Sequence, residues 1–228
     1  MKNFKHIFNI DLIRKKRGIK MDRYVVFDLE TTGFSHNTDE IIEIGAWKVE
    51  DGIPVSEFST LVKPSRGIPY NIQRITHITS DMVKDEPEIG EIITGFYEFC
   101  EGYPILGHNL PFDYRFMKAT CEKFSLDFTE RGLRSGIDTY SLARKFYNLD
   151  RNKLEDLVKY FCLQTRGGKA GKCGEFHRAR YDAYMTHLVY QCMLSEYPEI
   201  IEINTPYLLE EKGKRVREVG DCGSLDFE

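Results

Sequence analysis

The sequence predicts an α/β protein built on a mixed sheet with helices on both faces. Three strand patterns open the chain, and a hairpin signal at Asp51-Gly52 joins the second to the third. Helical patterns and one more short strand pattern follow in alternation, which is typical of parallel strands in one sheet. We therefore expect three antiparallel strands followed by parallel strands.

The first expected strand is Tyr24–Leu29, a continuous run of β-branched and aromatic residues that is typical of a buried central strand. Two more strands are expected at Ile41–Val49 and Val55–Val62, on either side of the hairpin turn. Later in the chain, Pro104–Gly107 has the pattern of a short strand. These segments make up the predicted sheet.

The helical patterns fall after the hairpin. Apolar residues in Pro87–Glu101 recur on one helical face, and Gly102 is expected to end that helix. The other expected helices are two short pieces at Asn71–Ile75 and Ser80–Val83, with Thr79 or Ser80 as a cap, a helix from a cap at Asn109 to about Phe124, then Ile137–Tyr147, Leu154–Leu163 with Asn152 as a cap, and Ala179–Tyr197.

The composition is that of a soluble globular protein, with 41% hydrophobic and 30% charged residues. The 228 residues suffice for one domain with extensions. No apolar run approaches the roughly 20 residues that a bilayer requires, so we expect no membrane span. The net charge of −4 argues against a protein that binds nucleic acid through overall basicity.

Charge is spread unevenly along the chain. Residues 1–20 hold seven basic residues and one acidic residue, so the remainder must carry −10 if the whole carries −4. This acidic remainder has two readings: indifference to nucleic acid, or carboxylates collected for cations. We interpret 1–20 as a flexible basic extension, or as sequence upstream of a start at Met21, 21–197 as the folded domain and 198–228 as a loosely packed tail.

Cysteine usage bears on the compartment. The six cysteines have no regular spacing, and the N-terminal segment lacks the apolar core of a signal peptide. We therefore expect reduced thiols and a cytoplasmic protein.

Two acidic residues stand at the end of the first strand pattern. Asp28 and Glu30 stand two residues apart, so in a strand both side chains point to the same face. Like charges so close repel each other, and a cation would relieve that repulsion. Oxygen ligands suit Mg²⁺ or Mn²⁺, so this strand end is a candidate metal site.

Two later segments offer further groups for such a site. Asp113 falls in the first turn of the helix that Asn109 opens, where it can be aimed back at the strand ends or simply favour the helix dipole. His177 and Asp182 stand five residues apart and would face different ways on one helix. If His177 instead precedes the helix, on the glycine-rich loop, both can reach one site.

Three motifs in this order resemble those of the DEDDh, or DnaQ-like, 3′→5′ exonuclease family: FDLETTG at 27–33, HNLPFD at 108–113 and HRARYD at 177–182. The family includes the proofreading epsilon subunit of DNA polymerase III and the exonuclease part of PolC-type polymerases. The resemblance spans about 21–193 and implies a ribonuclease H-like sheet. One departure is Thr76-His77-Ile78-Thr79, where the family often has Thr-Gly-Ile-Thr.

The resemblance also implies the roles of individual residues. Four carboxylates would hold two Mg²⁺ or Mn²⁺ ions: Asp28, Glu30, Asp113 and Asp182. His177 would be the general base, and nucleoside 5′-monophosphates would leave from a 3′ end. The substrate would be contacted by Thr31, Thr32, Phe34, Thr76 and Asn109. A basic cluster of Lys169, Lys172, Arg178 and Arg180 is either a phosphate contact or a solvated surface.

The leading interpretation is a proofreading or repair exonuclease that acts on the 3′ end of single-stranded DNA, with a DNA polymerase as a possible partner and no membrane. An RNA 3′ exonuclease with the same two-metal chemistry is the alternative, because no motif exposes a contact to a 2′-hydroxyl. A noncatalytic nucleic-acid-binding module is a third reading. It predicts the loss of a metal ligand, whereas all four acids and His177 are present.

Overall fold

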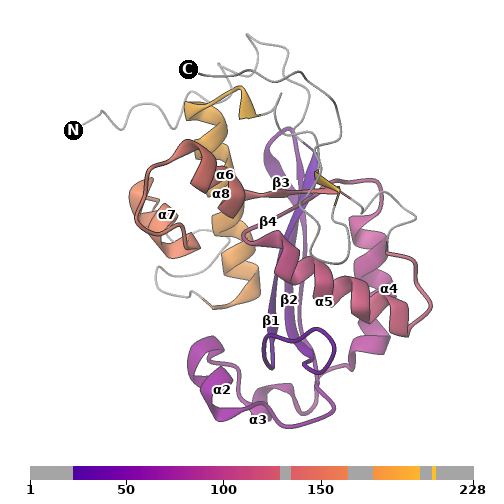
Figure 1. Ribbon diagram of the computed structural model, residues 1–228. Coiled ribbons are helices and arrows are strands. Elements are labelled where there is room, and N and C mark those ends of the chain that lie inside the picture. Colours follow the sequence, from indigo (N-terminus) through magenta and orange to yellow (C-terminus); the bar gives the residue numbers. More distant parts are fainter. Residues whose placement is uncertain (1–22, 129–134, 164–176, 201–206, 209–228) are drawn as a thin grey trace.

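A computed structural model describes residues 23–128, 135–163, 177–200 and 207–208 (Figure 1). Its strands form one sheet in the order β3-β2-β1-β4-β5-β6. The bounds are β1 Tyr24–Thr31, β2 Ile41–Glu50, β3 Ile53–Leu61, β4 Ile105–Gly107, β5 Ser135–Asp138 and β6 Tyr207–Leu208. The first three strands are antiparallel, and β4 and β5 run parallel to β1. The predicted mixed sheet is confirmed.

Helices cover both faces of the sheet, as predicted (Figure 1). Their bounds are α2 Tyr70–Thr76, α3 Ser80–Val83, α4 Ile89–Cys100, α5 Leu110–Lys123, α6 Thr139–Phe146, α7 Leu154–Tyr160 and α8 Ala179–Glu196. Helices α4 and α5 lie on one side of the sheet, while α6, α7 and α8 lie on the other. The described part of the chain contains no helix both long and apolar enough to cross a membrane.

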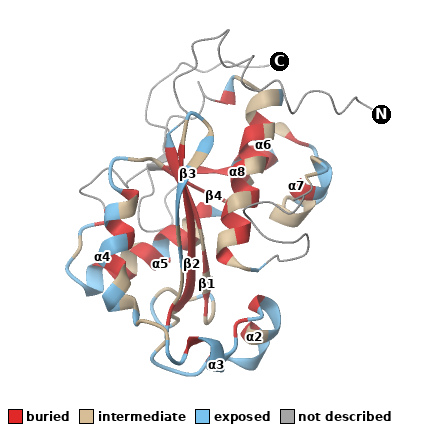
Figure 2. Ribbon diagram, turned by 180° about the vertical axis from the view of Figure 1, so that it is seen from behind, coloured by how far each residue is buried: buried red, intermediate tan, exposed pale blue. Residues whose placement is uncertain are grey.

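Strand β1 supplies both hydrophobic cores because its side chains alternate between the two faces. Val25 and Phe27 belong to the core under α4 and α5, whereas Tyr24 and Val26 belong to the core under α8. Figure 2 shows β1 and β2 as buried strands between these helix layers. The face that carries Tyr24 and Val26 is therefore also the face on which Asp28 and Glu30 lie.

Several predicted local signals are confirmed. Asp51 and Gly52 both have positive φ, 50° and 67°, as a two-residue hairpin turn requires. The side chain of Thr79 accepts a hydrogen bond from the backbone N–H of Met82 and caps α3. Gly102, with a φ of 76°, lies just after α4.

The segment predicted as the helix Ile137–Tyr147 is part strand, so that prediction was wrong at its start. Ile137 lies in β5 and pairs with Leu106 of β4. The helix begins at Thr139 because Asp138 caps it, accepting a hydrogen bond from the N–H of Tyr140. A buried strand of four residues shows no alternation, so its pattern is continuous with that of the helix.

One predicted cap was right only in its position, and another was wrong. Asn109 does precede α5, but its backbone is left-handed and its side chain makes no capping hydrogen bond. Asp138 instead accepts hydrogen bonds from the N–H groups of Asn109 and Leu110, at 2.8 and 3.3 Å. Lys153, and not Asn152, is the residue that precedes α7.

The structure bears on only one of the two predicted domain boundaries, the one at residue 197. Residues 1–20 lie outside the described residues, as do Lys169 and Lys172 of the predicted basic cluster. In the segment predicted as a tail, Ile200 is fully buried and β6 pairs with β5. The sheet therefore continues past 197. The described cysteines, Cys100, Cys121, Cys162 and Cys192, are all free thiols.

Gly45 lets α8 approach β2 closely. A Cβ built at this position would lie 2.1 Å from the backbone N of Arg180 and 2.2 Å from the carbonyl carbon of Ala179. Such distances are impossible between non-bonded atoms, so the helix start contacts the strand backbone only because residue 45 has no side chain.

Gly45→Ala is expected to destabilise the fold by about 1–3 kcal/mol, because α8 must move away from β2. Gly95→Ala is the matched control. Gly95 lies on the exposed side of α4 with nothing within 4 Å of an added Cβ, so this change should stabilise by about 0.5–1 kcal/mol. Urea denaturation measures both free energies of unfolding. A Gly45→Ala variant as stable as the parent would contradict the packing described.

Candidate functional site

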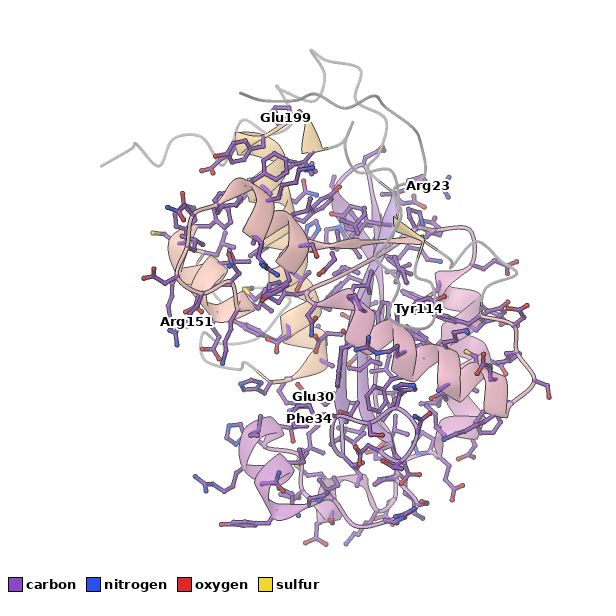
Figure 3. The ribbon with its side chains drawn as sticks, in the orientation of Figure 1. Arg23, Glu30, Phe34, Tyr114, Arg151 and Glu199 are labelled. Atoms are coloured by element: carbon purple, nitrogen blue, oxygen red, sulfur yellow. The ribbon has the colours of Figure 1, made fainter. Side chains whose placement is uncertain are left out.

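The candidate site lies at the C-terminal end of β1. Asp28 and Glu30 continue the face that Tyr24 and Val26 bury against α8, and a register shift follows between Glu30 and Thr31. Figure 3 shows Glu30 at the end of the sheet, with Phe34 close to it. Strand alternation thus places both carboxylates together, as predicted.

Asp113 is brought to the same strand end by the first turn of α5. Its side chain is only 4% exposed. The backbone N–H of Leu29, between Asp28 and Glu30, donates a hydrogen bond of 3.1 Å to Asp113 Oδ1. This bond ties α5 directly to the residue that separates the two strand carboxylates.

Asp182 arrives from α8, and His177 from the residues just before it. The helix begins at Ala179, and His177 has a left-handed backbone with a φ of 66°. This conformation turns the chain so that the N–H of His177 donates to Asp182 Oδ2 at 3.0 Å. The two side chains can therefore serve one site. Ligand atoms of Glu30, His177 and Asp182 lie within 4.8 Å of one another.

The acids are held in surroundings that disfavour their charge. Burial, aided by the neighbouring carboxylates, raises the pKa of Asp28 well above its usual value. Burial likewise raises the pKa of Glu30 to about 9, of Asp113 to about 8 and of Asp182 to about 7. The hydrogen bonds from Leu29 and His177 oppose this effect at Asp113 and Asp182.

These residues fit a divalent cation. Asp182 Oδ1 is buried without a hydrogen-bond partner, while Oδ2 is held by the backbone. Carboxylate oxygens are the ligands that Mg²⁺ and Mn²⁺ prefer, and a bound cation would offset the mutual repulsion of the acids. The cluster can therefore hold metal.

The predicted substrate contacts are placed in two ways. Phe34 is 82% exposed beside the site, with its ring 6.4 Å from that of Phe112. The threonine hydroxyls are instead used within the chain: Thr31 donates to the carbonyl of Gly33, and Thr32 accepts from the N–H of Glu40.

Thr76 and Asn109 are the other two predicted contacts. Thr76 is buried, and its hydroxyl donates to the carbonyl of Ile72 and accepts from the N–H of Ile78. His77 follows it with a left-handed φ of 58° and an exposed side chain, at the position where the family often has glycine. Asn109 stands at the start of α5, four residues before Asp113.

Sequence analysis missed two acids near the site. Glu43 is 2% exposed on β2 and pairs in register with Glu30. Glu155, on α7, places Oε1 3.6 Å from His177 Nε2. The signal for Glu43 was an acid inside the apolar strand pattern of residues 41–49. No local signal points to Glu155, because its proximity to His177 is tertiary.

The family comparison identifies the chain as nuclease-like. Residues 25–190 match the RNase T family, which is described as exonuclease. The PolC-type DNA polymerase III of Clostridium perfringens is 38% identical over 192 residues, which cover 84% of this chain and 12% of that polymerase. The PolC-type enzyme of Thermotoga maritima is 39% identical over 170 residues, covering 73% and 11%. The chain thus spans only a small part of these relatives.

Solved structures show the same fold. Exonuclease X in complex with 5′-overhanging duplex DNA superimposes with a TM-score of 0.61 at 28% identity, over 77% of this chain and 93% of that one. Escherichia coli exonuclease I in complex with a dT13 oligonucleotide gives a TM-score of 0.67 at 17% identity, over 79% and 43%. These likenesses confirm the predicted ribonuclease H-like architecture.

The raised pKa values predict how pH acts on the metal-free protein. The stabilising contribution of neutral acids is full below about pH 4 and is lost as pH rises through the folded-state pKa values of about 7 to about 9. In chelator, the melting temperature should therefore fall from about pH 6 to about pH 9. Millimolar Mg²⁺ should restore stability, and more so at the higher pH.

An Asp28→Asn variant is the control for this measurement. It removes one of the repelling charges, so its melting temperature in chelator should depend less on pH, and Mg²⁺ should stabilise it less. Scanning fluorimetry at both pH values gives these differences. Equal stabilisation of the parent by Mg²⁺ at both pH values would contradict the assignment of a shared cation site.

Proposed function

Because the chain belongs to the RNase T exonuclease family, we propose that it hydrolyses phosphodiester bonds at the 3′ ends of single-stranded DNA and releases nucleoside 5′-monophosphates. One observation carries the proposal: carboxylates from β1, α5 and α8 meet where burial disfavours their charge, with an imidazole beside them. The solved neighbours support DNA as the substrate, since exonuclease X is bound to overhanging duplex DNA and exonuclease I to an oligonucleotide.

Two Mg²⁺ or Mn²⁺ ions would be held by Asp28, Glu30, Asp113 and Asp182. When bound, such ions would supply charge stabilisation to the attacking and leaving oxygens of an in-line displacement. His177 would take the proton of the attacking water, because imidazole is the side chain that most often serves as a general base. Glu155, 3.6 Å from His177 Nε2, would stabilise the imidazolium that results.

The exposed ring of Phe34 would stack on a base near the 3′ end, a contact typically worth about 1–3 kcal/mol and tolerant of sequence. Thr31, Thr32, Thr76 and Asn109 complete the proposed substrate contacts. The hydroxyls of the three threonines are already bonded within the chain, so their contacts would use methyl or backbone groups.

The wider setting is also proposed. Residues 21–197, extended by β6, would form the nuclease domain of a cytoplasmic protein. The PolC-type relatives support a DNA polymerase as partner. An RNA 3′ exonuclease is the second candidate, because metal ions held by the same acids would assist hydrolysis of either a DNA or an RNA backbone. A noncatalytic binding module is disfavoured, since every proposed ligand and His177 is in place.

Labelled DNA and RNA oligomers of the same sequence test this proposal. We expect 3′→5′ shortening of single-stranded DNA with Mg²⁺ or Mn²⁺, and none in chelator or with Asp28→Ala. Asp150→Ala, which changes an exposed acid between α6 and α7, is the control and should cleave like the parent. Cleavage that persists in chelator or with Asp28→Ala would refute the metal assignment, and faster cleavage of RNA would favour the second candidate.

His177→Ala should lower the rate of cleavage by roughly 10²- to 10⁴-fold, the usual contribution of a general base. Metal binding should survive in this variant, because the four carboxylates remain. Steady-state kinetics and a Mn²⁺ titration measure the two effects. A variant that retains the full rate would remove His177 from this role.

A further inference from the structure

The start of α8 packs on one face of β2, where it contacts three alternate residues of the strand. Glu43 accepts hydrogen bonds from Arg178 Nε and Nη2 at 3.1 and 2.8 Å. It also accepts one from the N–H of Ala179 at 2.9 Å. Gly45 contacts the backbone of 179–180, and Trp47 Nε1 donates to the carbonyl of Arg180 at 3.1 Å. Residues 178–180 are therefore held to β2 by side-chain, backbone and packing contacts together.

These docked residues lie between two members of the candidate site. His177 immediately precedes Arg178, and Asp182 lies one turn beyond Arg178, whose carbonyl accepts its N–H at 3.0 Å. The hydrogen bond from His177 N–H to Asp182 Oδ2 closes this turn. Any movement of Arg178 and Ala179 away from β2 must displace both His177 and Asp182.

The same contact sets the position of these groups relative to β1. Glu43 is the register partner of Glu30, so the residue that anchors α8 lies directly across from a proposed metal ligand. Strand pairing thus fixes Glu43 relative to β1, and the ion pair with Arg178 fixes the start of α8 relative to Glu43.

Arg178 directs two donors of its partly exposed guanidinium at the buried Glu43. Glu43 is 2% exposed, and a buried carboxylate without a partner is strongly destabilising. Arg178 grips both oxygens of Glu43, a geometry in which charge-assisted hydrogen bonds are strong and directional. The bonds of Arg178 Nε and Nη2 to Glu43 give this residue a third role, beside the phosphate contact and the solvated surface considered for the basic cluster.

We propose that Glu43 and Arg178 are positioning residues, whose ion pair sets where His177 and Asp182 stand relative to Asp28 and Glu30. This inference rests on the proposed exonuclease function. The pair acts on the rate of hydrolysis and not on affinity for nucleic acid, because Glu43 is buried and Arg178 Nε and Nη2 are bonded to it. Misplacement of reacting groups by about 1 Å can cost roughly 100-fold in rate.

Three substitutions and a double variant test the pair: Glu43→Gln, Arg178→Gln, both together, and Glu57→Gln as control. Glu57 of β3 accepts a hydrogen bond from Arg180 Nη2 at 3.0 Å, so it makes the exposed counterpart of the same contact on the same helix start. Each change at 43 or 178 should lower kcat by roughly 10- to 100-fold, with KM within about twofold.

The double variant should be no slower than the slower single variant, because both changes break one interaction. Glu57→Gln should match the parent, as exposed ion pairs contribute little. The proposal is overturned if Glu43→Gln retains full kcat, or if the two losses multiply. It is also overturned if Arg178→Gln raises KM and weakens the salt dependence while Glu43→Gln does neither, since that pattern marks a phosphate contact.

Hydrogen–deuterium exchange separates this proposal from the function on which it rests. Amides of 177–183 should exchange faster in Glu43→Gln and Arg178→Gln than in Glu57→Gln or the parent, whether or not the parent cleaves nucleic acid. Unchanged exchange would overturn the positioning role by itself. If the glutamine variants do not fold, Arg178→Lys replaces them: it keeps the charge but loses the fork, and the same fall in kcat is expected.

Discussion

The main physical constraint on this structure is the unfavourable free energy of placing several carboxylates close together in one buried site. Asp28, Glu30, Asp113 and Asp182 come from three elements, and burial disfavours the charge of each. Backbone hydrogen bonds at Asp113 and Asp182 offset part of that cost. A divalent cation, as proposed for this site, would offset the rest.

The sheet supplies the rigidity that such a site needs. Alternation along β1 sends apolar residues into both cores and leaves Asp28 and Glu30 at its end. The same alternation along β2 aligns Glu43, Gly45 and Trp47 under the start of α8. Strand β1 therefore carries two of the acids, and the neighbouring strand β2 carries the residues that hold α8. The pairing between Glu30 and Glu43 keeps the two strands in register.

The failures of sequence analysis share one physical cause. Asn109 has the residue type of a cap, yet Asp138, from the next strand in the sheet, satisfies the helix start in its place. The sequence pattern predicts a helix at Ile137, which lies in β5, because a short buried strand shows no alternation of apolar and polar residues. In both cases a contact between distant segments overrode a local preference.

The sequence by itself indicated the first four strands, the helices and the hairpin at Asp51-Gly52, and it predicted one site for the four acids and His177, because periodicity, turn chemistry and motif spacing are local properties. It missed β5 and β6. Only the tertiary structure decided that His177 precedes α8 and bonds to Asp182, and that the threonine hydroxyls bond within the chain. It alone decided that Arg178 serves Glu43. Partners in a fold are chosen by distance in space, and 135 residues separate Glu43 from Arg178, so no local pattern can record their contact.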